Sequence, residues 1–212
     1  KEGYVSFKKI HMKLLYSFYK IISFSIFRKV KRFIILCIKC KFFFKDPENK
    51  EFIFFDNENV TYIDEILPNK NYAIVPTRIK LINKIFVSKK IIFFILKNIF
   101  KRSLKQNYLT ALIRRIAPKI VITNIHDSVD FHIISKILHN EIKFVAIQSY
   151  APYMFNTMFS EKEKKKFFIP KFFCFGEYEK IFFEKKKVNI GSYEPVGSVR
   201  SSMAHEYSKS KK

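Results

Sequence analysis

Residues 120–150 read IVITNIHDSVDFHIISKILHNEIKFVAIQSY, and this stretch decides the predicted fold. The apolar, β-branched run that opens it predicts a buried strand, and KFVAIQSY at 143–150 predicts a second strand. Between the two, residues 127–138 have the apolar spacing of an amphipathic helix. Strands that alternate with helices pair in parallel through right-handed crossovers, so the stretch predicts an α/β fold.

The same alternation continues on both sides of this stretch. Apolar runs predict further strands at the start of 51–67 and within 71–78, 171–176 and 193–200. Further helices are predicted within 91–100, 107–118 and 177–187. We therefore expect residues 51–203 to form a Rossmann-like parallel sheet flanked by helices.

A basic segment precedes this domain. Residues 1–45 contain twelve Lys and Arg and one acid, Glu2, and the apolar spacing of 5–45 predicts a helix. Lys20 and Arg28 break its apolar runs, which are shorter than the roughly 20 apolar residues of a membrane span. Such a basic amphipathic helix can lie on an anionic membrane face, or it can pack on the domain with a solvated basic side.

The composition restricts the class of protein. The 212 residues are 48% hydrophobic and 17% aromatic, which excludes wholesale disorder. The net charge of +23 suggests an anionic partner, namely nucleic acid, a membrane surface or a phosphorylated substrate. AT-rich coding is an alternative source of this charge, because it also produces much Lys, Ile, Phe and Asn. The odd number of cysteines, three, favours a reducing compartment over a disulfide framework.

Polar residues follow the predicted strands at their carboxyl ends. In an open parallel sheet these ends share one edge, where ligands bind, so NIHDS, QSYAP, FGEY and PVGSVR are expected along one rim. His126 is a candidate for catalysis or substrate contact at a strand tip, or it hydrogen-bonds a neighbouring loop. Asp127 or Ser128 suits the start of the next helix, where a side-chain oxygen caps backbone amides. The spacing within HDSVDFH matches no zinc pattern, so no metal site is predicted.

The motifs PKIVITNIHDSVDFHIISKIL, KFVAIQSY, FFCFGEYEKIFF and EPVGSVRSS follow one another along the chain. Together they resemble the amino-terminal half of GT-B-type bacterial surface carbohydrate biosynthesis proteins, relatives of capsule polysaccharide transferases and teichoic-acid glycerophosphotransferases. The resemblance covers residues 51–203 and departs from the family pattern at His126 and Ser149. The rim position and the resemblance together make His126 and Asp127 the catalytic candidates. Substrate binding is implied for Ser128, Gln148, Ser149, Gly176, Gly197, Ser198 and Arg200.

The resemblance implies the acceptor-side half of a glycosyltransferase-like, or glycerophosphotransferase-like, enzyme. The donor would be a nucleotide-activated sugar, the acceptor a glycan or lipid-linked glycan, and no further cofactor is expected. Residues 204–212 would be a polar tail before a donor-binding domain, and the enzyme would work at the inner face of the cytoplasmic membrane. Two alternatives stay open: a non-enzymatic basic protein that binds membranes or nucleic acid, and half of a sugar-nucleotide epimerase. Most aromatic residues fall at core-like spacing, which argues against nucleic acid as the partner.

Overall fold

A computed structural model of the protein describes residues 31, 34–36, 38–61, 71–150, 167–198 and 201–202. The chain divides into two compact units, residues 1–41 with 79–85 and residues 42–78 with 86–212. The second unit holds the six-stranded sheet, the helices that pack on it and the candidate site.

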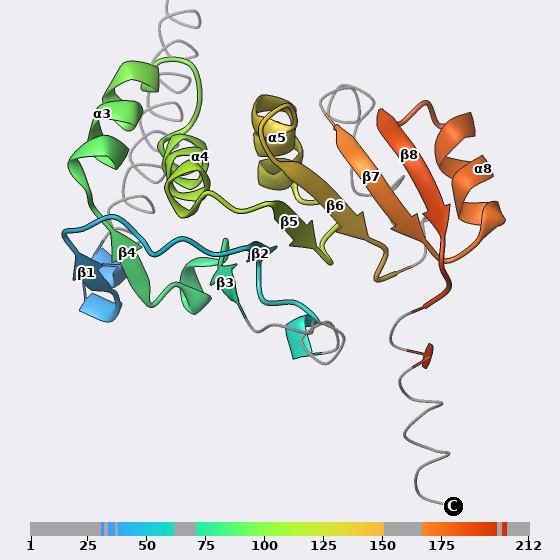
Figure 1. Cartoon of the computed structure of the whole chain (residues 1–212), viewed down its shortest axis with the longest axis horizontal. Coiled ribbons are helices and arrows are strands. Elements are labelled where there is room, and N and C mark those ends of the chain that lie inside the picture. The colour runs from blue at the N-terminus through green and yellow to red at the C-terminus, as the bar shows by residue number, and fades with distance from the viewer. Residues whose placement is uncertain are drawn as a thin grey trace, which may run out of the picture. The chain divides into compact units, whose positions relative to one another are not determined.

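Six parallel strands form the main sheet (Figure 1). They are β2 (Phe52–Phe55), β3 (Tyr72–Val75), β5 (Ile120–Thr123), β6 (Lys143–Ile147), β7 (Ile169–Cys174) and β8 (Ile190–Pro195). Their order across the sheet is β3-β2-β5-β6-β7-β8, and each neighbouring pair is parallel. The predicted Rossmann-like α/β fold is confirmed.

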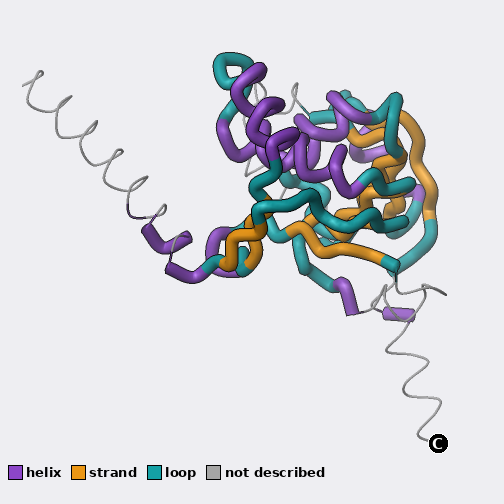
Figure 2. Tube along the Cα trace, turned by 60° about the vertical axis from the view of Figure 1, so that its left-hand side comes forward, coloured by secondary structure: helices purple, strands orange, loops and turns teal. Residues whose placement is uncertain are grey.

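Four helices of nine or more residues lie in the described part of this unit. They are α3 (Lys89–Asn98), α4 (Leu104–Ile116), α5 (Val129–Leu138) and α8 (Glu177–Lys185), and Figure 2 shows helices lying beside the stacked strands. The side chains of Ser88, Ser103 and Ser128 each accept a backbone amide of the first turn of α3, α4 and α5. Ser103 and Gln106 complete a reciprocal capping box, and Pro118 follows the end of α4.

The direction of winding reverses between β2 and β5. From β2 the chain passes outward to its neighbour β3, and it then returns to β5 on the opposite side of β2. All six strands run the same way, so their carboxyl ends share one edge of the sheet. In open parallel sheets, the crevice at such a reversal is where ligands bind. The residues that follow β2 and β5 are therefore the first candidates for a ligand-binding site.

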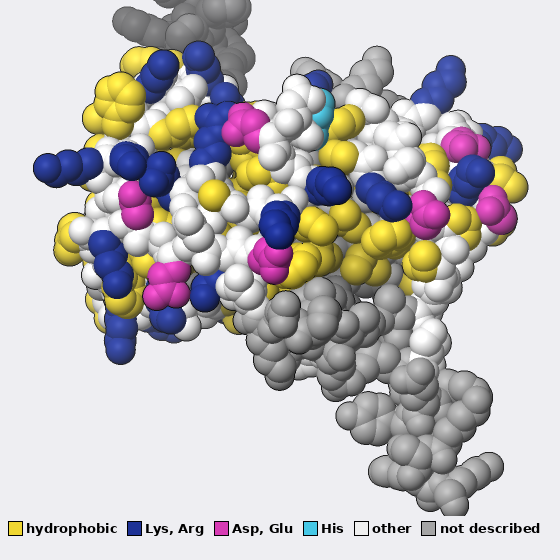
Figure 3. All heavy atoms as spheres, viewed as in Figure 1, with side chains coloured by type: hydrophobic (Ala, Val, Ile, Leu, Met, Phe, Trp, Pro, Cys, Tyr) yellow, Lys and Arg dark blue, Asp and Glu magenta, His cyan; other side chains and the backbone are white. Residues whose placement is uncertain are grey.

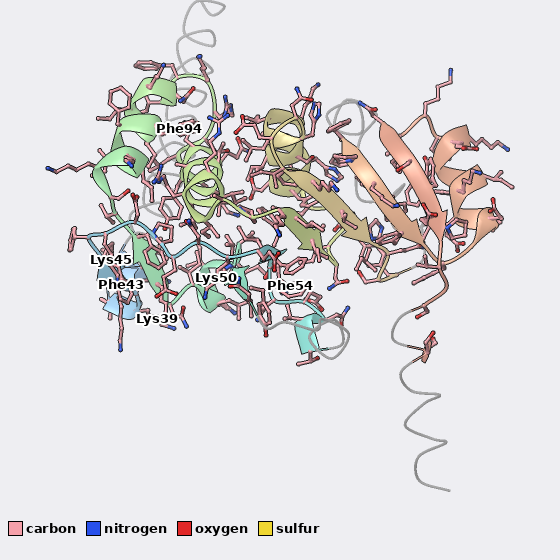
Figure 4. The ribbon with its side chains drawn as sticks, in the orientation of Figure 1. Lys39, Phe43, Lys45, Lys50, Phe54 and Phe94 are labelled. Carbon is pink, nitrogen blue, oxygen red and sulfur yellow. The ribbon has the colours of Figure 1, made fainter. Side chains whose placement is uncertain are left out.

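The central strand β2 is apolar throughout because both of its faces are covered. Ile53 and Phe55 join the main hydrophobic core, which continues into α4, α5 and α8. Phe54 points to the other face and packs with Val60 and Ile122 in a smaller cluster (Figure 4). The residues that follow β2 are therefore anchored from both sides of the sheet.

Three predicted boundaries are corrected by the structure. Residues 41–43 form a short strand, β1 (Lys41–Phe43), which pairs with β4 (Lys84–Phe86), where a helix over 5–45 was predicted. The aromatic run KFFF suits an extended strand better than a helix. Strands β7 and β8 begin two and three residues before the predicted runs. A short 3-10 helix spans Ile79–Leu81.

Residues 5–30 of the predicted front helix lie outside the described residues, as does the tail at 204–212. Among the helices that the structure does describe, none combines the length and the apolar character that crossing a membrane requires.

Candidate functional site

Asp56 stands directly after β2 at the centre of a polar cluster. Its backbone lies in the left-handed region, with φ of 76°, which is uncommon for a residue that has a side chain. The side chain is buried: its Oδ2 accepts a 2.7 Å hydrogen bond from Thr77 Oγ1, and its Oδ1 accepts one of 2.8 Å from the Asn57 amide. The Asp56 amide donates to Val75 O, so the ladder between β2 and β3 extends to this residue.

Arg78 follows β3 and brings a half-exposed cation to the same cluster. Its Nε lies 3.2 Å from Asp56 Oδ2, and its Nη2 lies 2.8 Å from Glu58 Oε2 and 3.1 Å from Asn57 Oδ1. The hydrogen bond to Glu58 and the charge of Asp56 raise the pKa of Arg78 above its ordinary value. The guanidinium is thus fixed in position while about half of the side chain remains in solvent.

The tips of β2, β5 and β6 are tied together by side-chain hydrogen bonds. Thr123 Oγ1 donates to Phe55 O at 3.1 Å, and Asn124 Nδ2 donates to Glu58 O at 2.8 Å. Ser149, after β6, donates its hydroxyl to Asn124 O. These bonds make a continuous polar rim across the point where the winding reverses.

Gln148 is buried and fastens the loops after β6 and β7. Its Oε1 accepts a 2.9 Å bond from the Phe175 amide, and its Nε2 donates to Tyr150 O at 3.0 Å. The amide group is therefore engaged by the protein itself. Gln148 positions the rim, and the predicted contact with a substrate stays a prediction.

His126 lies below the rim in an aromatic enclosure. It is fully buried, and its ring centroid lies 4.3 Å from that of Tyr150 and 5.6 Å from that of Phe172. Neither ring nitrogen has a hydrogen-bond partner among the described residues. Burial lowers its pKa to about 4, so the imidazole is neutral at pH 7. His132, on α5, is also buried, and burial lowers its pKa to about 4 as well.

Asp127 and Ser128 lie at the rim, where β5 leads into α5. Ser128 is the cap of α5 and accepts the Phe131 amide at 3.4 Å, which settles the choice that the sequence left open. Asp127 is partly buried. Burial and the neighbouring Asp127 carboxylate raise the pKa of the Tyr150 hydroxyl. Asp127 is therefore a carboxylate at the rim that is partly accessible to solvent.

The predicted glycine and serine positions follow β7 and β8. Gly176 precedes α8 in extended backbone, and Gly197 lies after β8 with φ of 78°, a conformation that favours glycine. Gly197 also donates its amide to Phe175 O at 3.1 Å, which joins the two tips. Ser198 accepts the Ser201 amide on its hydroxyl at 3.3 Å. Arg200 lies outside the described residues.

The structure brings those predicted residues that it describes to one edge of the sheet, and it adds a group that sequence reasoning missed. Residues from the tips of β5, β6 and β7 lie along the carboxyl edge, as expected from parallel pairing. The missed group consists of Asp56, Glu58 and Arg78, at the tips of β2 and β3. The polar run DNEN after the apolar run was the available signal. Among the described residues, no three His, Cys, Asp or Glu side chains are grouped to hold a metal ion.

Fold and site together define an α/β protein with a Rossmann-like parallel sheet and a cluster of polar side chains at its winding reversal. Comparisons of the chain with protein-family models, with curated proteins and with solved structures find no match.

Proposed function

We propose that this chain is the acceptor-side half of a glycosyltransferase-like enzyme of bacterial surface polysaccharide biosynthesis, with its acceptor bound at the carboxyl edge. The observation that carries the proposal is the cluster of Asp56, Glu58 and Arg78 beside Asn124, at the reversal between β2 and β5. Asp56 is buried and holds Arg78, while the half-exposed Arg78 guanidinium and Glu58 carboxylate remain accessible to a ligand. Groups that are fixed in this way suit the hydroxyl groups of a sugar, because each can bind two of them in a plane.

The proposed reaction needs a group that accepts one proton. An acceptor hydroxyl attacks the anomeric carbon of a nucleotide-activated sugar, the bond from that carbon to the phosphate oxygen breaks, and the nucleoside diphosphate departs. The hydroxyl proton passes to a carboxylate, and Asp127 is the candidate because it is partly accessible at the rim. His126 is neutral and could accept a proton, but its full burial favours Asp127 for this role.

Ligand-detected NMR tests the proposal on the purified chain. Saturation-transfer difference spectra would be recorded with neutral oligosaccharides, with glycerol-phosphate oligomers and with nucleotide diphosphates. We expect a saccharide or glycerol-phosphate signal that falls at least about fivefold in Arg78→Ala and Glu58→Gln, since each variant removes one fixed polar partner. The matched control is Glu184→Gln, an exposed acid near the end of α8, which should leave the signal unchanged.

Two outcomes would contradict the proposal. One is the absence of any saccharide or glycerol-phosphate signal from the folded wild-type chain. The other is a signal that Arg78→Ala and Glu58→Gln leave intact, because the ligand would then bind away from the carboxyl edge. A signal from nucleotides alone would favour the sugar-nucleotide epimerase half instead.

A further inference from the structure

Helix α3, the turn that follows it and the first residue of α4 expose an unusual number of large apolar side chains. We call these six residues the α3 surface: Ile92, Phe93, Leu96, Ile99, Phe100 and Leu104. Their exposed fractions run from 43% at Ile92 to 100% at Phe100. Figure 3 shows apolar side chains interspersed with Lys and Arg over this part of the molecule, at the upper left. An exposed apolar patch of this kind marks an interaction surface.

The opposite side of α3 is also apolar, so apolar side chains occupy two sides of a helix that also carries Lys90 and Lys97. Ile91 is buried, and Phe94 and Ile95 pack against the main core (Figure 4 labels Phe94). The core covers one of these apolar sides, and the other side is exposed. A partner that covers the exposed side would therefore come from outside α3 and the core on which it packs.

The exposed turn is held in place rather than loosely extended. Asn98 and Asn107 are buried, and Asn107 Nδ2 donates to Asn98 O at 2.8 Å and to Arg102 O at 3.4 Å. Asn98 Nδ2 in turn donates to Phe94 O at 2.9 Å. Phe100 is therefore exposed to solvent on a turn that the buried side chains of Asn98 and Asn107 hold in place.

Cations surround the α3 surface. The segment 89–105 carries six, namely Lys89, Lys90, Lys97, Lys101, Arg102 and Lys105, and no acid occurs between Glu65 and Asp127. A pocket of about 420 Å³ between α3 and α4 adds Arg114 and Arg115 to Lys90 and Lys97. Arg114 pairs with Glu141 and Arg115 with Asp46, while Lys97 has no acidic partner in the part of the chain that the structure describes. The pocket therefore keeps an excess of positive charge.

We propose that the α3 surface docks on an anionic lipid bilayer, with its apolar side chains at the boundary between headgroups and acyl chains. Its cations would contact lipid phosphates, and the pocket between α3 and α4 would accept one phosphate headgroup. Charge complementarity selects this partner over the protein's own front segment. Residues 1–30 carry seven Lys and Arg against one Glu, so they would bring more positive charge to a surface that is already basic. Nucleic acid would satisfy the cations but would leave the aliphatic side chains without an apolar partner.

The absence of tryptophan from the chain allows a direct test. Phe100→Trp places a single fluorophore on the α3 surface, and Tyr178→Trp places one at an exposed position of α8 as the matched control. On addition of phosphatidylcholine vesicles that contain phosphatidylglycerol, we expect a blue shift and quenching by brominated acyl chains in the Phe100→Trp variant only. Pure phosphatidylcholine vesicles should produce neither effect.

Charge reversal supplies an independent measurement on the otherwise native chain. Lys97→Glu with Lys101→Glu should lower partitioning onto the anionic vesicles at least about tenfold, because each cation near an anionic surface adds to binding. The control pair, Lys185→Glu with Lys186→Glu near the end of α8, should change partitioning about threefold or less, since only long-range attraction is reduced. Both pairs change the net charge by the same amount. A loss of partitioning that occurs only in the Lys97→Glu, Lys101→Glu variant therefore places the lipid contact at the α3 surface.

Three results would overturn the proposal. The first is co-sedimentation of the Phe100→Trp variant with vesicles while its tryptophan emission stays unshifted, because binding would then use another segment. The second is emission from that variant that is already blue-shifted in buffer, because the chain or a second copy would then cover the surface. The third is an equal loss of partitioning in both charge-reversal pairs. None of these results bears on saccharide binding at the carboxyl edge, so the two proposals fail separately.

Discussion

Arg78 and Asp56 meet across the tips of two adjacent parallel strands, with 3.2 Å between the arginine Nε and the aspartate Oδ2. The carboxylate is buried and the guanidinium is half exposed, so the pair joins the interior to the surface at the edge where ligands are expected. The Thr77 hydroxyl and the Asn57 amide also donate hydrogen bonds to this carboxylate. Removal of the carboxylate therefore leaves several donors without their acceptor at once.

Asp56→Ala should lower the free energy of unfolding by about 2–4 kcal/mol, since it leaves Thr77 and Arg78 without their acceptor. Alanine is also a poorer residue for the left-handed backbone found here. Asp56→Asn should cost less, because asparagine tolerates that conformation and keeps one acceptor oxygen. Urea denaturation at pH 7 measures both values. Equal losses in the two variants would contradict the argument.

The buried histidines should make the protein acid-labile. The unfolded chain binds these protons near pH 6.5, whereas the folded protein binds them on His126 and His132 only near pH 4. The free energy of unfolding is therefore highest above about pH 7. It decreases as the pH falls toward 4, by up to about 3 kcal/mol for each histidine. Urea midpoints between about pH 7.5 and pH 4.5 measure this loss, and a midpoint that stays constant across this range would contradict it.

His126→Phe separates the contribution of one ring. Phenylalanine retains the aromatic packing and removes two buried nitrogens that lack partners among the described residues, so the variant should be as stable as the wild type or more stable at pH 7. Its stability should also depend less on pH. The exposed His139 is the control, and His139→Gln should keep the full pH dependence. A large loss of stability at pH 7 in His126→Phe would show that the ring has an unseen polar role.

Three glycines should differ in their tolerance of alanine. A Cβ at Gly191 would lie 2.6 Å from the Pro170 backbone oxygen on the neighbouring strand, so Gly191→Ala should cost about 1–3 kcal/mol. At Gly197 there is space, but φ is positive, so the expected cost is about 1–2 kcal/mol. Gly176 meets only the Glu179 side chain at 3.5 Å, and its substitution should cost less than about 0.5 kcal/mol. Thermal unfolding ranks the three variants, and a larger effect at Gly176 than at Gly191 would refute the ranking.

Asn107→Ala should loosen the turn that presents Phe100. The variant loses the bonds from Asn107 to the carbonyls of Asn98 and Arg102, at a cost of about 1–2 kcal/mol. Hydrogen exchange should accelerate in the peptide that covers 98–103 more than in the strands. Asn140→Ala, an exposed asparagine after α5, is the control and should leave exchange unchanged.

The elements of the sheet were largely predictable because most carry strong local signals. β5 and β6 are apolar, β-branched runs, and α5 has a clear helical period with Ser128 at its start. The starts of β7 and β8 were missed, since Pro170 and Gly191 stand inside these strands and both residues argue against a strand when read locally. Both lie where tertiary pairing overrides local preference.

The site was only partly predictable, because local sequence does not specify the order of the strands in the sheet. The parallel arrangement placed the tips of β5, β6 and β7 at one edge, and this expectation needed no knowledge of order. The importance of Asp56 and Arg78 depends on β2 lying between β3 and β5, which results from packing across the whole sheet. The burial of His126 likewise depends on Phe172 and Phe183, which are distant in sequence. A polar residue at a strand tip does not reveal on which side of the rim its side chain lies.

The cluster of Asp56, Glu58 and Arg78 beside Asn124 forms a seam between the tips of β2 and β5, and this seam has a practical consequence for identifying a ligand. Any compound seated there would bridge the two oppositely wound portions of the sheet and bind only the native chain. Occupancy would then raise the melting temperature in proportion to the logarithm of compound concentration, once this exceeds the dissociation constant. A thermal-shift screen could thus search for the natural ligand without an assay for turnover, and Arg78→Ala would mark the hits that occupy this seam.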